Sequence, residues 1–257
     1  MIRTAKSCDD WTLNDLNAYS IKLNKQDHLS FFGIQALPPP RVPQELLDKS
    51  EAEDMVLHQN VELIHLLHLA MDHLAGERAA ADFGVELFRV LGYVHRTRVA
   101  RTWKDLVLLV CGEQQCSIID VCLVDRSQSD AILLLLQEDK SAETEGSSLN
   151  PEAQLIAKAL AAFEENNKNR EANGLQPLVE TVMPGIVMQG TTPIFYKIPV
   201  TQQLLCHVRH GTYPSESTSA DYCYPPLSGD YREGMKSLDN RKQILSCFEA
   251  FKPIVGI

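Results

Sequence analysis

The stretch from Ala131 to Lys140, AILLLLQEDK, constrains the fold of this chain more than any other. Five consecutive apolar residues end abruptly in three charged ones, and turn residues precede the run. A run of this kind is typical of a strand that is buried on both faces of a sheet. Its charged end lies at the edge of the sheet, where a site can form. Because side chains alternate along a strand, Glu138 and Lys140 share one face and Asp139 takes the other.

Composition limits the classes of protein that fit this stretch. The chain has 257 residues, enough for one large domain or two small ones. It has no apolar run of the roughly eighteen residues that a membrane helix needs, and we expect no signal peptide. Seven cysteines without a CxxC pair predict a reduced intracellular protein, cytoplasmic or nuclear. The net charge of −10 argues against a general nucleic-acid coat but leaves room for a local basic surface.

An arm and two helices are expected ahead of the strands. Residues 1–43 contain a short helix and a proline-rich extended segment, and we interpret them as an N-terminal arm. This arm is either a strap over the domain or a docking arm for a partner or a second subunit. Apolar residues recur at helical spacing over 44–74 and 78–91. Four histidines in the first helix lack the tight, recurring spacing of a metal site, so they are expected to be ordinary polar positions.

A cationic run, HRTRVARTWK, occupies residues 95–104 and contains no acid. It suits either a solvated loop or a surface that follows a nucleic-acid backbone, because basic side chains interleaved with Trp103 match phosphates and bases. Its basic members, expected to bind nucleic acid, are Arg96, Arg98, Arg101 and Lys104.

Three strands follow, at 106–111, at 117–125 and within the opening stretch. Asp120 interrupts the second of them. An acid in a buried strand is costly unless it is paired or bound to a metal. Asp120 and Glu138 are eighteen residues apart, a spacing that accommodates one strand end, one turn and one strand.

The rest of the chain alternates helices with two more strands. A helix begins at Asn150 and Pro151, which are typical first residues, and continues to about Arg170. Strands are expected at 185–189 and 193–199, followed by a short helix, an irregular Tyr/Pro-rich segment at 211–230 and a C-terminal helix. Together these elements predict an α/β chain of the mixed-sheet α+β kind, with residues 44–257 as a single domain.

This order of elements, with Asp120 in the second strand and Glu138-x-Lys140 ending the third, resembles the PD-(D/E)xK nuclease superfamily. The resemblance covers about half of the chain, residues 78–199. It implies a restriction-endonuclease-like core in the order αβββαβ, with a helical N-terminal arm and C-terminal helices around it. It also implies metal-dependent hydrolysis of phosphodiester bonds in nucleic acid, DNA before RNA, with Mg²⁺ or Mn²⁺ as cofactor. A multicopy group of basidiomycete fungal proteins, for which no activity is established, resembles the chain at 137–140, 151–163 and 190–201.

The site of the superfamily maps onto this sequence one residue at a time. Asp120 matches the metal-binding aspartate, Glu138 the second metal-binding carboxylate, and Lys140 the catalytic lysine. Carboxylates on adjacent strands can bind one or two Mg²⁺ ions. A lysine on the same face can orient water or stabilise charge on the phosphoryl oxygens. Ile119 stands where many members have a proline, so the motif is incomplete at this position.

Two helices contribute further candidates. Glu86, at the border of the apolar face of helix 78–91, matches an acid that some members carry there and is expected to be a third metal ligand. Gln154 matches a catalytic glutamine of bacterial RecB-like exonucleases. Their tyrosine, four residues further along, is Lys158 in this chain.

Two other interpretations remain open. Glu138 and Lys140 can form an ion pair at the strand end, with Asp120 a satisfied buried acid. The fold would then be a catalytically inactive binding module for nucleic acid or protein. A protein that acts only through protein partners, by way of the arm and segment 211–230, is the third class, and a homodimer through the arm belongs to it. Three results separate these classes. Metal-dependent cleavage of nucleic acid indicates the enzyme, binding without cleavage indicates the inactive module, and the absence of both indicates a protein that acts through protein partners.

Overall fold

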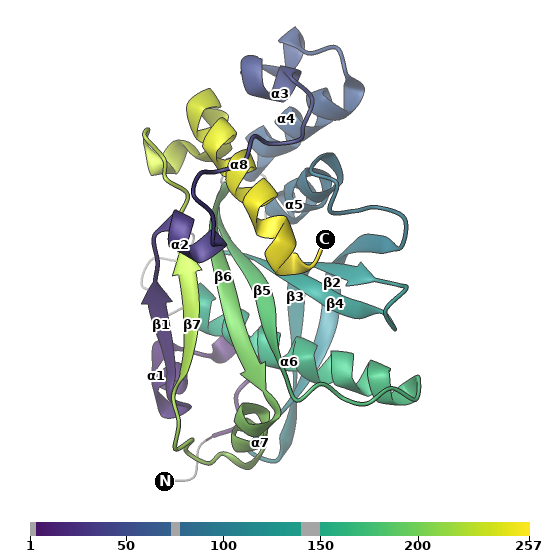
Figure 1. The fold of residues 1–257 in the computed structure, drawn as a ribbon, viewed down its shortest axis with the longest axis vertical. Helices are drawn as coiled ribbons and strands as arrows, with labels where there is room; N and C mark the ends of the chain where they lie inside the picture. The colour runs from purple at the N-terminus through teal and green to yellow at the C-terminus, as the bar shows by residue number, and fades with distance from the viewer. Residues whose placement is uncertain (1–3, 73–77, 140–149) are drawn as a thin grey trace.

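The computed structural model describes residues 4–72, 78–139 and 150–257, and in them seven strands form one mixed sheet (Figure 1). The strands are β1 (Ile21–Lys25), β2 (Arg98–Val110), β3 (Glu113–Asp125), β4 (Ala131–Glu138), β5 (Glu180–Gln189), β6 (Thr192–Thr201) and β7 (Thr218–Cys223). They lie in the order β1-β7-β6-β5-β4-β3-β2. β1 pairs with β7, and β4 with β5, in parallel, whereas the other neighbours are antiparallel.

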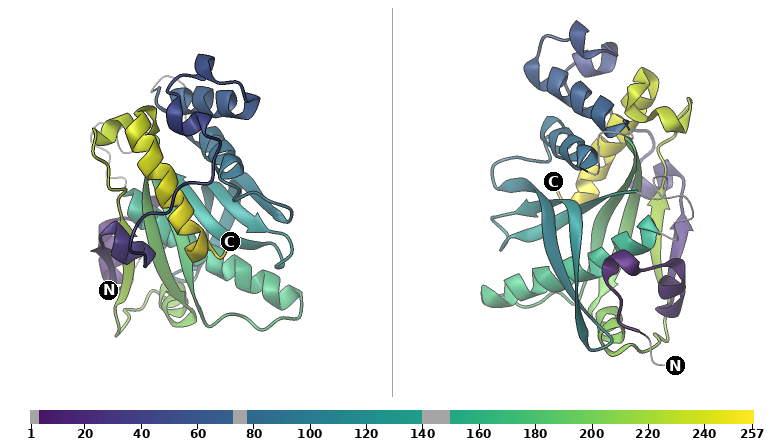
Figure 2. Two further views of the ribbon diagram at one scale, coloured as in Figure 1. Left: turned by 45° about the horizontal axis from the view of Figure 1, so that its top comes forward. Right: turned by 180° about the vertical axis from the view of Figure 1, so that it is seen from behind.

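Helices cover both faces of this sheet, as Figure 2 shows from two further directions. The α-helices are α1 (Leu13–Ala18), α2 (His28–Phe32), α3 (Glu45–Asp48), α4 (His58–Ala70), α5 (Ala79–Val90), α6 (Pro151–Ala172), α7 (Gln202–His210) and α8 (Leu238–Val255). Three 3₁₀ turns accompany them: η1 (Cys8–Asp10), η2 (Ala52–Asp54) and η3 (Tyr231–Lys236). One apolar core joins the sheet to α6, α1 and α7, and a second joins its other face to α5, α4 and α8. None of the described helices is long and apolar enough to cross a membrane.

The centre of the sheet has the element order that the sequence predicts. α5 leads into the antiparallel strands β2, β3 and β4, α6 crosses one face, and β5 returns parallel to β4. The expected α/β chain with a mixed sheet is therefore confirmed.

The opening stretch forms β4, a central strand with helices on both sides. Leu134, Leu135 and Leu136 have no exposed surface. Leu135 belongs to the core on the α6 side, whereas Leu134 and Leu136 belong to the core on the α5 and α8 side. Alternate side chains of one strand thus fill two different cores. The prediction of a strand buried on both faces is confirmed.

The segment predicted as an arm, residues 1–43, is packed into the domain wherever the structure describes it. Trp11, Tyr19 and Ile21 are buried in the same core as α6, and the rings of Trp11 and Tyr19 stack with centroids 5.3 Å apart. β1 extends the sheet beside β7. Full burial of one large apolar side chain stabilises the folded state by about 1.5–3 kcal/mol, which explains why this segment packs into the domain. These side chains are not available to a second subunit, so they provide no surface for the expected homodimer.

The single helix expected over 44–74 is divided into α3, η2 and α4. The break falls at Lys49 and Ser50, whose carbonyls accept hydrogen bonds from the buried Arg241 guanidinium at 2.8 and 3.2 Å. Lys49 has an extended backbone, with φ of −117° and ψ of 134°, so α3 ends there and these carbonyls have no partner within a helix. At the start of α4, the Glu45 carboxylate accepts three hydrogen bonds. They are donated by Val56 N, Leu57 N and Asn60 Nδ2.

The segment expected to be irregular, 211–230, contains β7, which lies between β6 and β1. Its sequence TSADYC has no apolar run, which is why it does not read as a strand. Tyr222 fixes it by stacking on Tyr196 of β6, with ring centroids 5.6 Å apart. The Tyr-rich composition therefore supports packing against the sheet rather than a free excursion.

Gly234 permits the turn inside η3. Its φ of 50° and ψ of −138° lie outside the regions open to residues with a Cβ. A Cβ built there would overlap Thr191 Oγ1, which accepts a hydrogen bond from Met235 N at 2.9 Å. We expect Gly234→Ala to lower the free energy of unfolding by about 2–3 kcal/mol, measured by urea denaturation.

A matched control is Gly92→Ala. Gly92 also has a positive φ, 74°, but a Cβ there would have no neighbour within 4 Å. For this variant the free energy of unfolding should fall only by the conformational cost of a left-handed alanine, about 1–2 kcal/mol. Equal losses in the two variants would contradict the steric account of η3.

Candidate functional site

A cavity of about 420 Å³ lies where β4 ends and α6 begins, beside η1. Among the described residues, five carboxylates and one ammonium line it, so its field favours cations. The described lining residues are Asp9, Asp10, Trp103, Ile118, Asp120, Gln137, Glu138, Asp139, Pro151, Gln154 and Lys158.

Asp120 reaches the cavity from β3 and is 6% exposed. The antiparallel register pairs Val121 with Leu136, which brings Asp120 to the end of β4. There its Oδ2 accepts a hydrogen bond from the backbone N–H of Glu138 at 2.9 Å. The cost of burying this acid is offset by a main-chain donor. The structure thus brings together the two residues that the sequence predicts as partners, through the main chain of Glu138 and the side chain of Asp120.

Glu138 is the last residue of β4, and Asp139 lies just beyond the strand. Asp139 N donates to Met188 O at 2.8 Å, and its Oδ2 accepts from Gln189 Nε2 at 2.9 Å. Asp139 nevertheless lines the same cavity as Glu138, whereas simple alternation assigns it to the opposite face. The reason is that the alternation applies only within the strand. Lys140, the predicted catalytic lysine, lies outside the described residues.

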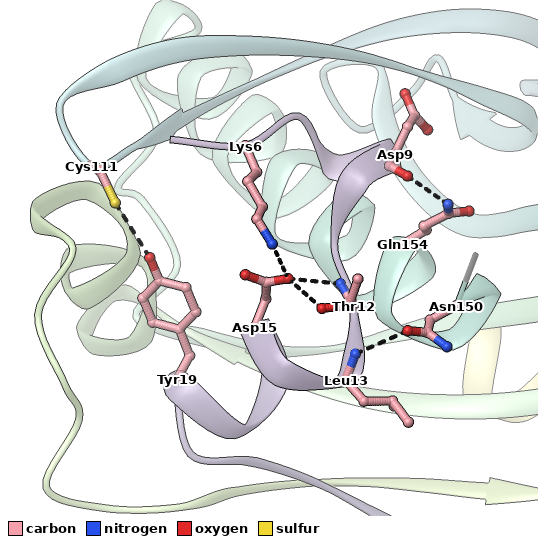
Figure 3. A network of polar contacts seen from close by, with 9 residues as sticks. All are labelled: Lys6, Asp9, Thr12, Leu13, Asp15, Tyr19, Cys111, Asn150 and Gln154. Carbon is pink, nitrogen blue, oxygen red and sulfur yellow. Dashed lines mark hydrogen bonds and ion pairs between the residues drawn. The ribbon is translucent and has the colours of Figure 1, made fainter. Parts of the chain in front are cut away.

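Gln154 and Lys158 project from successive turns of α6. Gln154 Oε1 accepts a hydrogen bond from Gln137 Nε2 at 2.6 Å. Gln154 Nε2 donates to Asp9 O, also at 2.6 Å (Figure 3). Lys158 Nζ forms an ion pair with Asp9 Oδ1 at 2.7 Å. The predicted Gln154 is therefore in the cavity with Asp120. Lys158 and Asp9 also line the cavity, although no sequence pattern predicts a role for either residue.

Further polar contacts fix the N-terminal segment. Leu13 N donates at 3.2 Å to Oδ1 of Asn150, the residue before α6 (Figure 3). Ser7 Oγ donates to Cys116 O of β3 at 2.9 Å. Within the segment, Lys6 Nζ pairs with Asp15 Oδ2 at 2.9 Å (Figure 3). No sequence pattern links residues so far apart in the chain, which explains why Asp9 was not expected in the site.

Trp103 forms another wall. It stands opposite Asp120 in the register, because Thr102 pairs with Val121 and Lys104 with Ile119. Its φ of 51° is left-handed and interrupts the pairing of β2 with β3 at this point. Such a conformation is strained in a residue with a Cβ, and strained residues cluster at functional sites. The Arg78 guanidinium lies 5.9 Å from the Trp103 ring centroid.

The cationic run belongs largely to β2, an edge strand, rather than to a loop. Arg101 is exposed, and Arg96 is exposed just before the strand. Arg98 donates to Gly92 O at 3.4 Å, and Lys104 pairs with Glu165 at 3.3 Å. The run therefore offers two exposed guanidiniums, with the other two basic groups partly engaged.

Glu86, the expected third metal ligand, is not among the residues that line the cavity. It is 4% exposed on α5. Its carboxylate accepts from Gln59 Nε2 at 3.1 Å and from Arg89 at 3.0 Å. These partners give Glu86 a role in joining α4 to α5, and the structure does not bring it together with Asp120.

Two buried cysteines flank the site without providing a thiolate. Burial raises the pKa of the Cys8 thiol to about 11, and it raises that of Cys122 to about 11 as well. Cys8 precedes Asp9, and Cys122 follows Asp120 by two residues on β3. Both thiols are protonated at neutral pH, so neither is a nucleophile or a ready ligand for a soft metal.

The donor chemistry of the cavity fits a hard divalent cation. Within the described ranges, no group of three or more His, Cys, Asp or Glu side chains is arranged to hold a metal. Mg²⁺ does not need such a group, because it commonly binds through one or two carboxylates, with water and substrate phosphate as the other ligands. Asp120 and Glu138 are two carboxylates of the kind that could bind Mg²⁺ in this way.

Comparisons with known proteins assign the chain to no group. No protein-family model matches it, and no curated protein matches it. The functional argument therefore rests on the geometry of the cavity.

Proposed function

We propose that this protein hydrolyses phosphodiester bonds of nucleic acid, DNA in preference to RNA, in a cavity built on a restriction-endonuclease-like core. The observation that carries the proposal is the convergence of Asp120 and Glu138. They come from adjacent antiparallel strands, the Glu138 backbone N–H donates to Asp120 Oδ2 at 2.9 Å, and both residues line one cavity with Gln154 from the next helix. An excess of carboxylates around a cavity is expensive unless a cation compensates it.

In this proposal each residue has a distinct task. The carboxylates of Asp120 and Glu138 would hold Mg²⁺ or Mn²⁺. The bound cation would supply Lewis-acid stabilisation of the charge that develops on the phosphate. Lys140, two residues after Glu138 in the sequence, would orient the attacking water or stabilise the phosphoryl oxygens. Gln154, whose amide is fixed by Gln137, would orient the substrate.

The test is cleavage of supercoiled plasmid and of single-stranded DNA in Mg²⁺ or Mn²⁺, with EDTA as control. Metal-dependent nicking that EDTA stops supports the proposal. RNA substrates of matched length then test the preference for DNA. Absence of cleavage with both cations on every substrate would contradict the proposed activity.

The edge strand β2 is the proposed route of the nucleic-acid backbone. The exposed Arg101 and the cavity wall Trp103 lie two residues apart on it. We expect Arg101→Gln to reduce the slope of log Kd against log salt by about 1, because each phosphate contact releases about one counterion. Arg232→Gln, an exposed arginine on η3, is the control and should leave the slope unchanged. Equal slopes for both variants and the native protein would show that Arg101 does not contact the nucleic-acid backbone.

A catalytically inactive module that binds nucleic acid is the second candidate. It is favoured by the contacts of the site residues, since Asp120 Oδ2 already accepts the Glu138 amide and Gln154 is held by both Gln137 and Asp9. DNA binding without cleavage in either cation would select this candidate over the enzyme.

A further inference from the structure

We propose that Lys158 binds a phosphate and that the Asp9 carboxylate occupies its place as an internal mimic of the phosphate. The inference deepens the proposed function and rests on it, because it identifies where the nucleic acid places a phosphate. Two separate contacts hold Asp9 against α6: Lys158 Nζ lies 2.7 Å from the carboxylate Oδ1, and Gln154 Nε2 donates to the main-chain O at 2.6 Å.

The ammonium of Lys158 is built into the wall of the cavity. Its side chain is 4% exposed, and it stands on a stretch of α6 where the neighbouring alanines and leucines are buried in the core. A buried charge is costly unless a partner compensates it, so this position always requires an anion nearby.

Asp9, the partner of this ammonium, is much more exposed to solvent than Lys158. The Asp9 side chain is 48% exposed and belongs to a three-residue turn, η1, at the surface. The turn itself is anchored, because Cys8 and Trp11 on either side are buried. The Asp9 carboxylate can therefore rotate into solvent while the backbone stays in place. A fixed buried cation with an exposed, displaceable anion is the arrangement expected of an occupied anion site.

Gln154 holds the backbone of Asp9 in place. Its Oε1 accepts from Gln137 Nε2 at 2.6 Å, which fixes its amide so that Nε2–H donates to the Asp9 main-chain carbonyl. Lys158, one helical turn further along α6, contacts the Asp9 carboxylate instead. When that carboxylate leaves, the Gln154 contact is kept and the Lys158 ammonium becomes available to donate charge-assisted hydrogen bonds to a phosphate. We infer that a backbone phosphate of the bound strand displaces the Asp9 carboxylate from Lys158.

The test is the affinity of the full-length protein for a fluorescein-labelled single-stranded oligonucleotide, measured by anisotropy in EDTA so that no cleavage occurs. Asp9→Asn keeps the size of the side chain and the backbone carbonyl that Gln154 binds, and it removes only the competing charge. We expect this variant to bind about tenfold more tightly than the native protein, because one charge-assisted contact becomes available to the phosphate. Lys158→Gln should bind about tenfold more weakly, and the double variant should match Lys158→Gln.

Asp10→Asn is the matched control, because Asp10 lines the same cavity and has no ion pair with Lys158. It should produce only the small gain that follows from removing one negative charge. If Asp9→Asn has a native melting temperature and binds no more tightly than Asp10→Asn, the phosphate site is refuted and the ion pair is only structural. Tight binding by Asp9→Asn without metal-dependent cleavage would support the phosphate site and refute the nuclease activity, so the two failures are distinguishable.

Discussion

Replacing Asp120 with asparagine is expected to lower metal-dependent DNA cleavage by at least about 10³-fold, since in the proposed function it removes a charge that would bind the cation and support transition-state stabilisation. Asparagine has the same shape, and its carbonyl oxygen can still accept the Glu138 N–H that Asp120 Oδ2 accepts at 2.9 Å. The variant should therefore keep a native melting temperature. Initial rates of plasmid nicking in Mn²⁺, with circular dichroism to follow unfolding, measure both quantities.

Asp125 provides the matched control on the same strand. Like Asp120 it is 6% exposed on β3. Its carboxylate accepts from Ser127 and Gln128 and is not among the residues that line the cavity. Asp125→Asn should lose about 1 kcal/mol of stability and keep its cleavage activity. If both variants lose activity to the same extent, the location of the site at Asp120 is contradicted.

Replacing Arg241 with methionine is expected to lower the free energy of unfolding by about 3–5 kcal/mol, because it leaves one buried and two partly buried carbonyls without their donor. Arg241 is 1% exposed. Its guanidinium donates to Met235 O and Lys49 O at 2.8 Å and to Ser50 O at 3.2 Å. It therefore ties α8 to η3 and to the break between α3 and α4. Urea denaturation, with the midpoint and slope fitted separately, measures the loss.

Lys242→Met is the control for this prediction. Lys242 is the next residue, its side chain is 44% exposed, and its contact with Asp239 is a surface ion pair at 4.0 Å. The change should stay within about 0.5 kcal/mol of the native protein. A similar small loss in Arg241→Met would show that the guanidinium does not hold these segments together.

Strong local patterns made the central elements predictable. β4 is recognisable because its apolar run is continuous, and α6 because Asn150 and Pro151 mark its start. Elements that depend on distant partners were missed. β7 has a polar sequence and becomes a strand only through pairing with β6 and β1. The break near Lys49 depends on Arg241, almost two hundred residues away in the chain.

The candidate site divides in the same way. Asp120 and Glu138 could be paired from the sequence, because consecutive antiparallel strands bring their ends together. The wall that Asp9 and Lys158 form could not be predicted from the sequence, because it depends on how the N-terminal segment packs on α6. Glu86 is a residue that the sequence places in the site and the structure does not. Its helical position is compatible with a site, but its carboxylate accepts hydrogen bonds from Gln59 and Arg89 instead.

The most direct test of the metal-dependent site is a crystal structure of the protein grown with Mn²⁺, with anomalous diffraction to locate the ion. The proposed function predicts an anomalous peak within about 2.5 Å of carboxylate oxygens of both Asp120 and Glu138. The same crystals of Asp120→Asn should lack it. A native structure with no peak at these carboxylates, under conditions in which Mn²⁺ is in large excess, would contradict a metal-dependent nuclease at this cavity.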